Sequence, residues 1–152
     1  MASNRHLGRI VALQSVYEYE FRQSDETPVD VAEVVARNLE RYKDEIGDIA
    51  FVETLVAGVI EKLDELDATL QPLAPDWPLA QVARVDRNIL RVGLYELLHC
   101  QDTVPARVAI NEAVELAKSF GSDNSSKFIN GVLGTAYRTL VEDQDDGKRT
   151  EV

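Results

Sequence analysis

The first helix-forming segment carries a group of basic side chains close to the N-terminus. Arg5 and Arg9 are four residues apart, so both project from the same side of a helix, and His6 lies beside them. Positive side chains on one helix face are suited to contacting phosphate groups. Arginines on a helix surface also serve solubility alone. The spacing therefore predicts a modest phosphate-facing patch and leaves the plain surface alternative open.

A second group lies in the polar segment 121–128, GSDNSSKF, which joins two expected helices. The free backbone N–H groups and the positive dipole end at the start of the following helix attract anions. Lys127 adds a cation, Asn124 can reach a phosphate or a base edge, and Phe128 offers a ring on which an unpaired base can stack. An equally good alternative is that the segment only caps the helix and that Phe128 belongs to the core.

The sequence lacks the residue patterns of common catalytic and metal sites. Its two histidines, His6 and His99, are far apart, and neither HExxH nor a GxxxxGK phosphate loop is present. A single cysteine, Cys100, excludes an internal disulfide and a cysteine-based metal cluster. His99 and Cys100 are adjacent, and neighbouring helical residues point about 100° apart instead of forming a nucleophile–base pair. We therefore expect a binding protein that is not an enzyme and needs no cofactor.

The formal net charge of −11 is unfavourable for nucleic-acid binding, which needs a basic surface. The acidic residues are concentrated, however. Residues 23–78 hold fourteen acidic and four basic residues, and the tail 142–152 holds five acidic and two basic residues. Residues 1–22 and 79–141 each have a net charge of +1. A phosphate-binding surface would therefore be formed by the first helix and the C-terminal half.

Apolar residues recur at spacings of three and four along most of the chain, which is the period of an amphipathic helix. The expected helices cover residues 4–22, 30–46, 48–70, 79–83, 85–100 and 105–120, and a last helix begins at a cap within 123–125 and reaches Leu140. In the first helix the expected apolar stripe is Ile10, Leu13, Tyr17 and Phe21. No segment alternates apolar and polar residues as a half-buried strand would.

Four glycines lie inside the expected helices, where each costs about 1 kcal/mol relative to alanine. We expect helices to cross closely at these positions, because a close crossing leaves no space for a side chain. The four are Gly58, Gly93, Gly131 and Gly134.

The segment 71–78, QPLAPDWP, holds three prolines and must interrupt the helical run. We take it as the boundary between two helical halves of one domain, residues 1–142, and expect the acidic tail 143–152 to be disordered. The fold class is therefore all-α, with about seven helices in two small bundles. Apolar residues make up 45% of the chain, with no run of membrane-spanning length and no signal-peptide pattern, so we expect a cytoplasmic globular chain.

Residues 85–134, VDRNILRVGLYELLHCQDTVPARVAINEAVELAKSFGSDNSSKFINGVLG, closely resemble the C-terminal half of NusB-family proteins. The shared pattern is an acidic residue before an ILR-type helix, then YEL, then VPxxVAINEAVELAKxF, a short polar loop and KFxNGVL. The N-terminal RxxxRxxALQSVYEYE is similar to the family's arginine-rich start followed by AxQxLY. The resemblance extends over residues 5–141, although residues 23–78 match in pattern only.

This resemblance implies seven helices in two three-helix bundles. It also implies binding of the single-stranded boxA segment of nascent ribosomal RNA together with the ribosomal protein NusE, within an RNA polymerase complex that suppresses transcription termination. The RNA-binding residues implied by position are Arg5, His6, Arg9, Asn124, Lys127 and Phe128. The implied partner-binding residues are Tyr17 and Asp86, and Asp86 would pair with a basic residue of NusE.

The N-terminus departs from the family pattern, because family members often carry four or more closely spaced arginines there. With fewer phosphate contacts, we expect weak RNA affinity without the partner. Two alternatives stay open. One is a NusB-like accessory domain of a ribosomal RNA methyltransferase, which would need a cofactor-binding domain that these 152 residues do not contain. The other is a homodimeric relative with weakened RNA binding.

Overall fold

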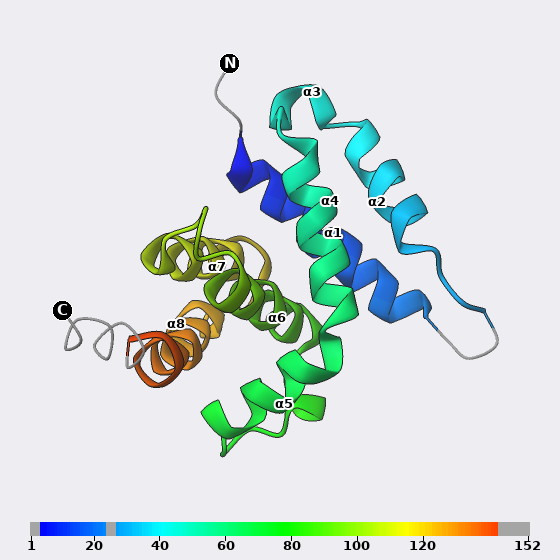
Figure 1. Cartoon of the computed structure of the whole chain (residues 1–152). Coiled ribbons are helices and arrows are strands. Elements are labelled where there is room, and N and C mark those ends of the chain that lie inside the picture. Colours follow the sequence, from blue (N-terminus) through cyan, green and yellow to red (C-terminus); the bar gives the residue numbers. More distant parts are fainter. Residues whose placement is uncertain (1–3, 24–26, 143–152) are drawn as a thin grey trace. The chain divides into compact units, whose positions relative to one another are not determined.

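The computed structural model describes residues 4–23 and 27–142 (Figure 1), and in these ranges every regular element is a helix. The elements are α1 (Arg5–Arg22), α2 (Val31–Glu40), α3 (Lys43–Ile46), α4 (Ile49–Glu61), α5 (Leu63–Leu73), the 3-10 helix η1 (Leu79–Gln81), α6 (Arg84–His99), α7 (Ala106–Phe120), α8 (Ser125–Ala136) and the π-helix η2 (Tyr137–Glu142). The all-α class is confirmed, and eight α-helices in the described ranges are close to the seven expected. The tail 143–152, which we expected to be disordered, lies outside the described residues.

The chain divides into two compact units, residues 1–63 and 64–152. In the first unit α1 packs against α2, α3 and α4, and α2 also packs against α4. In the second unit α6, α7 and α8 pack against one another, and η2 packs against α6 and α8. The division lies ahead of the segment 71–78 where we placed it. The helix expected over 48–70 is interrupted at Lys62, and α5 continues through Pro72 before it ends.

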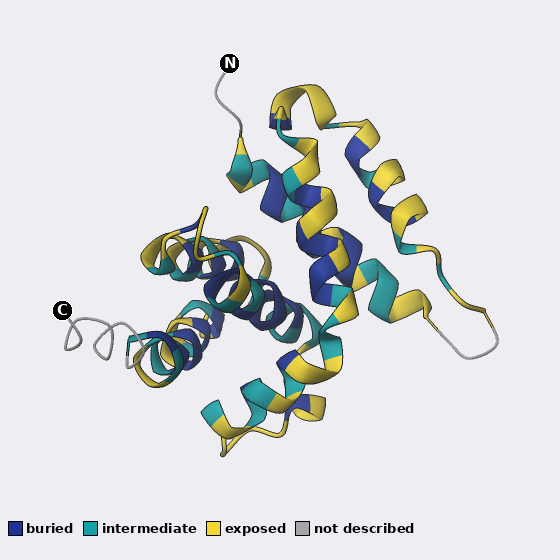
Figure 2. Cartoon of the chain, in the orientation of Figure 1, coloured by how far each residue is buried: buried dark blue, intermediate teal, exposed yellow. Residues whose placement is uncertain are grey.

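The core of the first unit uses a different face of α1 from the one that the spacing suggested. Val11, Ala12, Leu13 and Val16 are at most 5% exposed, and dark blue marks this inner face in Figure 2. Of the expected stripe only Leu13 belongs to this core; Tyr17 is 36% exposed and Phe21 is 68% exposed. The expectation was therefore wrong for most of the stripe. α1 packs against α2 and α4 together, and this requires a face that holds small residues as well as large ones.

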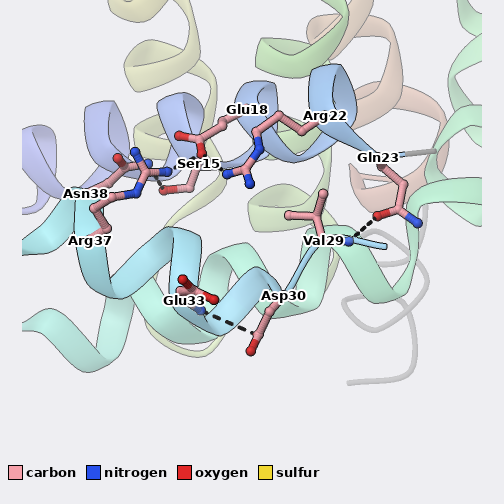
Figure 3. Close-up of polar contacts among 9 residues, drawn as sticks. All are labelled: Ser15, Glu18, Arg22, Gln23, Val29, Asp30, Glu33, Arg37 and Asn38. Carbon is pink, nitrogen blue, oxygen red and sulfur yellow. Dashed lines mark hydrogen bonds and ion pairs between the residues drawn. The ribbon is translucent and has the colours of Figure 1, made fainter. Parts of the chain in front are cut away.

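Polar side chains join α1 to α2 in the first unit (Figure 3). Glu18 accepts hydrogen bonds from Arg22, at 2.7 Å, and from Arg37 of α2. Asn38 donates to Ser15 Oγ at 3.1 Å. Partial burial raises the pKa of Glu18, but the hydrogen bonds from the two arginines and the charge of Arg37 outweigh it and hold that pKa below the usual glutamate value.

The second unit is built around α6, whose apolar side chains point to several sides of the helix axis. Ile89, Leu90, Leu94 and Leu97 are at most 1% exposed, which confirms the central position expected for this helix. Arg91 is also buried and makes two hydrogen bonds, of 2.8 and 2.7 Å, to Asp67 of α5. No helix in the two described ranges is long and apolar enough to cross a membrane.

The expected close crossings at helical glycines are found at one position and not at two others. A Cβ on Gly93 would lie 2.7 Å from Leu133 Cδ1 and 3.1 Å from Ala113 Cβ, so α6 approaches α7 and α8 closely there. A Cβ on Gly131 would meet no atom within 4 Å. One on Gly134 would meet only the end of the Arg138 side chain, with Nη1 at 3.3 Å. The expectation was wrong for Gly131 and Gly134, which lie at no crossing.

Candidate nucleic-acid interface

The basic residues at the start of α1 gather around one aromatic ring of α4. The guanidinium carbon of Arg5 lies 4.6 Å from the centre of the Phe51 ring, and that of Arg9 lies 5.1 Å from it. Arg5 also forms an ion pair of 3.5 Å with Asp48. Both arginines are therefore held by cation–π contacts.

Arg5 and Arg9 differ in exposure, although their spacing puts them on one side of the helix. The Arg5 side chain is 35% exposed and His6 is exposed, whereas Arg9 is only 3% exposed. Arg9 thus does not lie on the surface where we expected it, because α4 and the Phe51 ring pack against this part of α1. The surface cation of this group that faces solvent is Arg5, with His6 beside it.

Local contacts hold the start of α1 against the start of α4. The Asn4 backbone N–H donates to Ile46 O at 2.8 Å, just before α4. A Cβ on Gly8 would lie 3.0 Å from Val52 Cγ2, so glycine permits the close approach. Asp48 caps α4 by accepting from the Phe51 N–H at 3.2 Å. Phe51 was missed in the sequence, where an aromatic residue near a helix start does not indicate an arginine partner.

In the second unit, Ser125, one of the three expected cap residues, shapes segment 121–128 through other bonds than a helix cap. Asn124 stands at the N-cap position of α8, but its side chain makes no capping bond. Ser125 is 2% exposed, and its Oγ accepts from the Ser122 N–H at 2.8 Å and donates to Asp86 Oδ2 at 2.9 Å. A Cβ on Gly121 would lie 2.5 Å from Ser125 Cβ. Glycine therefore allows this tight turn by leaving space for Ser125.

This turn forms one side of an open pocket of 320 Å³. The pocket is lined by Trp77, residues 81–83, Asp86, Ser122, Asn124, Ser125 and Phe128. The rings of Trp77 and Phe128 meet edge to face, with centroids 6.4 Å apart and planes at 76°. Trp77 is 60% exposed and Phe128 is half-buried. Two of the expected RNA residues, Asn124 and Phe128, therefore share one pocket, while Lys127 is exposed and does not line it.

Trp77 lies within the proline-rich segment that the sequence marked only as a helix break. A single side chain, Gln71 of α5, fixes the turn around it. Gln71 Nε2 donates to Ala74 O at 3.3 Å and to Trp77 O at 3.1 Å, and its Oε1 accepts from the Leu79 N–H at 2.9 Å. The signal for Trp77 in the sequence was a large aromatic residue among prolines and polar residues, where no apolar pattern would bury it.

The two expected partner residues have different surroundings. Tyr17 is 36% exposed on α1 of the first unit. Asp86 lies in the first turn of α6 in the second unit and is half-buried, instead of standing out as a surface charge. Its Oδ2 accepts from Ser125, and its buried Oδ1 accepts no hydrogen bond from any described residue. Asp86 thus supports the turn that carries Asn124 and Phe128 in addition to any contact with a partner.

Among residues 4–23 and 27–142, no group of three His, Cys, Asp or Glu residues is arranged to hold a metal ion. The polar atoms brought together here are hydroxyls, amides and one carboxylate, beside two aromatic rings. Such a set is suited to hydrogen bonding and stacking.

The sequence profile of the NusB family matches residues 6–138. The chain belongs to the NusB family. It is similar to the transcription antitermination protein NusB of Chloroflexus aggregans, with 41% identity over 146 residues that cover 95% of this chain and 94% of that protein. The similarity noted in segments 5–20 and 85–134 thus extends through the acidic middle of the chain as well.

Solved structures agree with this assignment. NusB of T. maritima superposes with a TM-score of 0.80 at 29% sequence identity, and the match covers 91% of this chain and 94% of that one. A chain in a crystal structure of the antitermination factors NusB and NusE in complex with double-stranded RNA has a TM-score of 0.76 at 23% identity, over 90% of this chain and 97% of that one. The second likeness concerns the fold alone.

Proposed function

We propose that this chain is a transcription antitermination factor that binds boxA-type single-stranded RNA together with a NusE-type ribosomal protein. In this proposal it joins an antitermination complex on RNA polymerase, works in the cytoplasm of a bacterium and catalyses no reaction. The observation that carries the proposal is the 41% identity, over nearly the full length of both chains, to a protein named as a transcription antitermination protein.

In this proposal each unit contributes RNA contacts of its own. In the first unit Arg5 and His6 are the exposed groups that meet phosphate. Arg9 is buried and contacts the same Phe51 ring as Arg5, so it helps to position that ring. In the second unit Lys127 meets phosphate, while Asn124 and Phe128 contact a base. The partner surface includes Tyr17 and Asp86.

The proposal is tested by titrating fluorescently labelled boxA RNA with the protein, alone and with the NusE-type partner. We expect weak binding alone and tighter binding with the partner, because few exposed cations of this chain meet phosphate. A scrambled RNA of the same composition is the control and should bind more weakly than boxA RNA when the partner is present. Equal binding of the two RNAs under both conditions would contradict the proposal.

A further inference from the structure

Resting on this proposed function, we propose that the pocket lined by Trp77 and Phe128 holds one unpaired nucleobase of the RNA, and that Trp77 is one of its contact residues. Nothing in the family resemblance assigned a role to Trp77, which lies in the turn between α5 and η1. The observations that lead to it are its exposure, its rigid attachment, its geometry relative to Phe128, and the charge of the pocket.

Trp77 is the largest apolar side chain that the described residues expose, at 60%. An exposed aromatic ring contributes little to folding, since the hydrophobic gain comes from area removed from water. Yet the backbone around it is fixed, because Gln71 bonds to Trp77 O and to the neighbouring Ala74 O and Leu79 N–H. An exposed ring on a fixed backbone, which also contacts Phe128, can stack on a ligand at a reduced cost in conformational entropy.

The geometry of the ring pair determines how a base enters. A centroid distance of 6.4 Å is that of two rings in direct contact, which falls at about 4.5–7 Å. No base fits between the rings, but their planes stand at 76°, so they form a corner. A base stacked on one ring therefore brings its edge to the other ring. The volume of 320 Å³ is at the lower end of small-ligand sites, about 300–1,000 Å³.

The charge of the pocket favours a base over a phosphate. Among the described residues that line it there is one carboxylate, Asp86, and no lysine or arginine. A phosphate would be repelled by this carboxylate. A neutral base instead finds short polar groups at its edge, from Asn124, Ser122 and Gln81. Lys127 lies outside the pocket, where the phosphate attached to the bound nucleotide can reach it.

The experiment uses the fact that Trp77 is the only tryptophan of the chain. The full-length protein, with the NusE-type partner present at a fixed concentration, is titrated with boxA RNA while tryptophan fluorescence is read against a titration of the partner alone. RNA binding is followed in parallel by anisotropy of an end label. We expect quenching of Trp77 with the same midpoint as the anisotropy change. A series of RNAs with one abasic position each should lose the quenching at one position while still binding.

Two substitutions complete the test. Stacking of one base contributes about 1–3 kcal/mol, so Trp77→Ala should weaken RNA binding by about 5- to 150-fold, whereas Trp77→Phe, which keeps a ring, should weaken it less. Phe21→Ala, at the 68% exposed aromatic residue of the first unit, is the matched control and should bind RNA like the wild type.

The possible outcomes separate the two proposals. RNA binding with unchanged tryptophan fluorescence and with no sensitive abasic position overturns the base pocket and leaves the proposed function standing. The abasic series uses the wild-type protein, so this conclusion does not depend on the folding of Trp77→Ala. Absence of boxA binding by the wild type, with or without the partner, overturns the proposed function itself.

Discussion

Arg5 and Arg9 lie four positions apart on α1 and differ in how they are placed. Both lie over the Phe51 ring, yet Arg5 keeps a third of its side-chain surface in water and Arg9 keeps almost none. A guanidinium tolerates such burial because it is weakly hydrated and can rest its flat face on an aromatic ring. The exposed one is available to a phosphate, while the buried one fixes α1 on α4.

The two arginines should therefore respond differently to substitution. Arg5→Gln should reduce the slope of log Kobs against log salt for RNA binding by about 0.7, the value for one phosphate contact on a single strand. The melting temperature of the Arg5→Gln variant should change little, because the ion pair between Arg5 and Asp48 that it loses is partly exposed. Arg9→Gln should lower the melting temperature clearly and leave the salt slope near that of the wild type. Equal behaviour of the two variants in both measurements would contradict this division of roles.

Ser125 carries the turn that presents Asn124 and Phe128. Ser125→Ala should lower the free energy of unfolding by about 1–3 kcal/mol, because the hydroxyl that links the Ser122 N–H to Asp86 is lost in a buried place. Ser126→Ala, at the neighbouring half-buried position, is the control and should change the free energy of unfolding by less than about 0.5 kcal/mol. Urea unfolding of both variants measures the difference, and matching unfolding midpoints would rule out the link.

Gly93 on α6 and Gly131 on α8 should respond in opposite ways to substitution by alanine. Gly93→Ala should lower the free energy of unfolding by about 1–3 kcal/mol, because the new Cβ would lie 2.7 Å from Leu133 on α8. Gly131→Ala should raise it by about 1 kcal/mol, because nothing lies within 4 Å and alanine is the better helix former. Thermal unfolding of both variants is the measurement. A loss of stability in Gly131→Ala would show that something packs there.

The contact between α1 and α2 should depend on pH through Glu18. Its pKa is lower in the folded protein than in the unfolded chain, so its contribution is complete above the unfolded value of about 4.3 and is lost as the pH falls through the lower folded value. Glu18→Gln should therefore lower stability at neutral pH and flatten the loss of stability between pH 5 and pH 3, both values being approximate. Parallel curves of stability against pH for the wild type and the variant would contradict this prediction.

The elements were predictable where a local pattern decides them, and the site was only partly predictable. The period of three to four gave the helices, and α6 was correctly placed at the centre of its bundle. The stripe ending in Tyr17 and Phe21 was wrong because packing against two helices at once selects another face of α1. Phe51 and Trp77 were missed because their contacts are with residues far away in the sequence. Phe51 contacts Arg9, and Trp77 contacts Phe128.

The overall charge of the protein limits how it can hold RNA. The net charge is −11, and the proposed phosphate contacts rest mainly on Arg5 and Lys127. With about 0.7 per contact, the slope of log Kobs against log salt should be close to −1.4 for the protein without its partner. RNA titrations at several salt concentrations give this slope. A slope steeper than about −3 would require further cations and would overturn the proposed surface.

The aromatic corner is built from residues 77 and 128, which are far apart in the sequence and meet only in the folded second unit. An unfolded chain has no such corner, so a base held there would bind the native state in preference to the unfolded chain. By mass action, free RNA at a hundred times its dissociation constant adds about 2.7 kcal/mol to the stability of the protein that it occupies. RNA would then stabilise the native state as a bound ligand does. Chains without RNA would unfold more often and would be degraded first by cellular proteases.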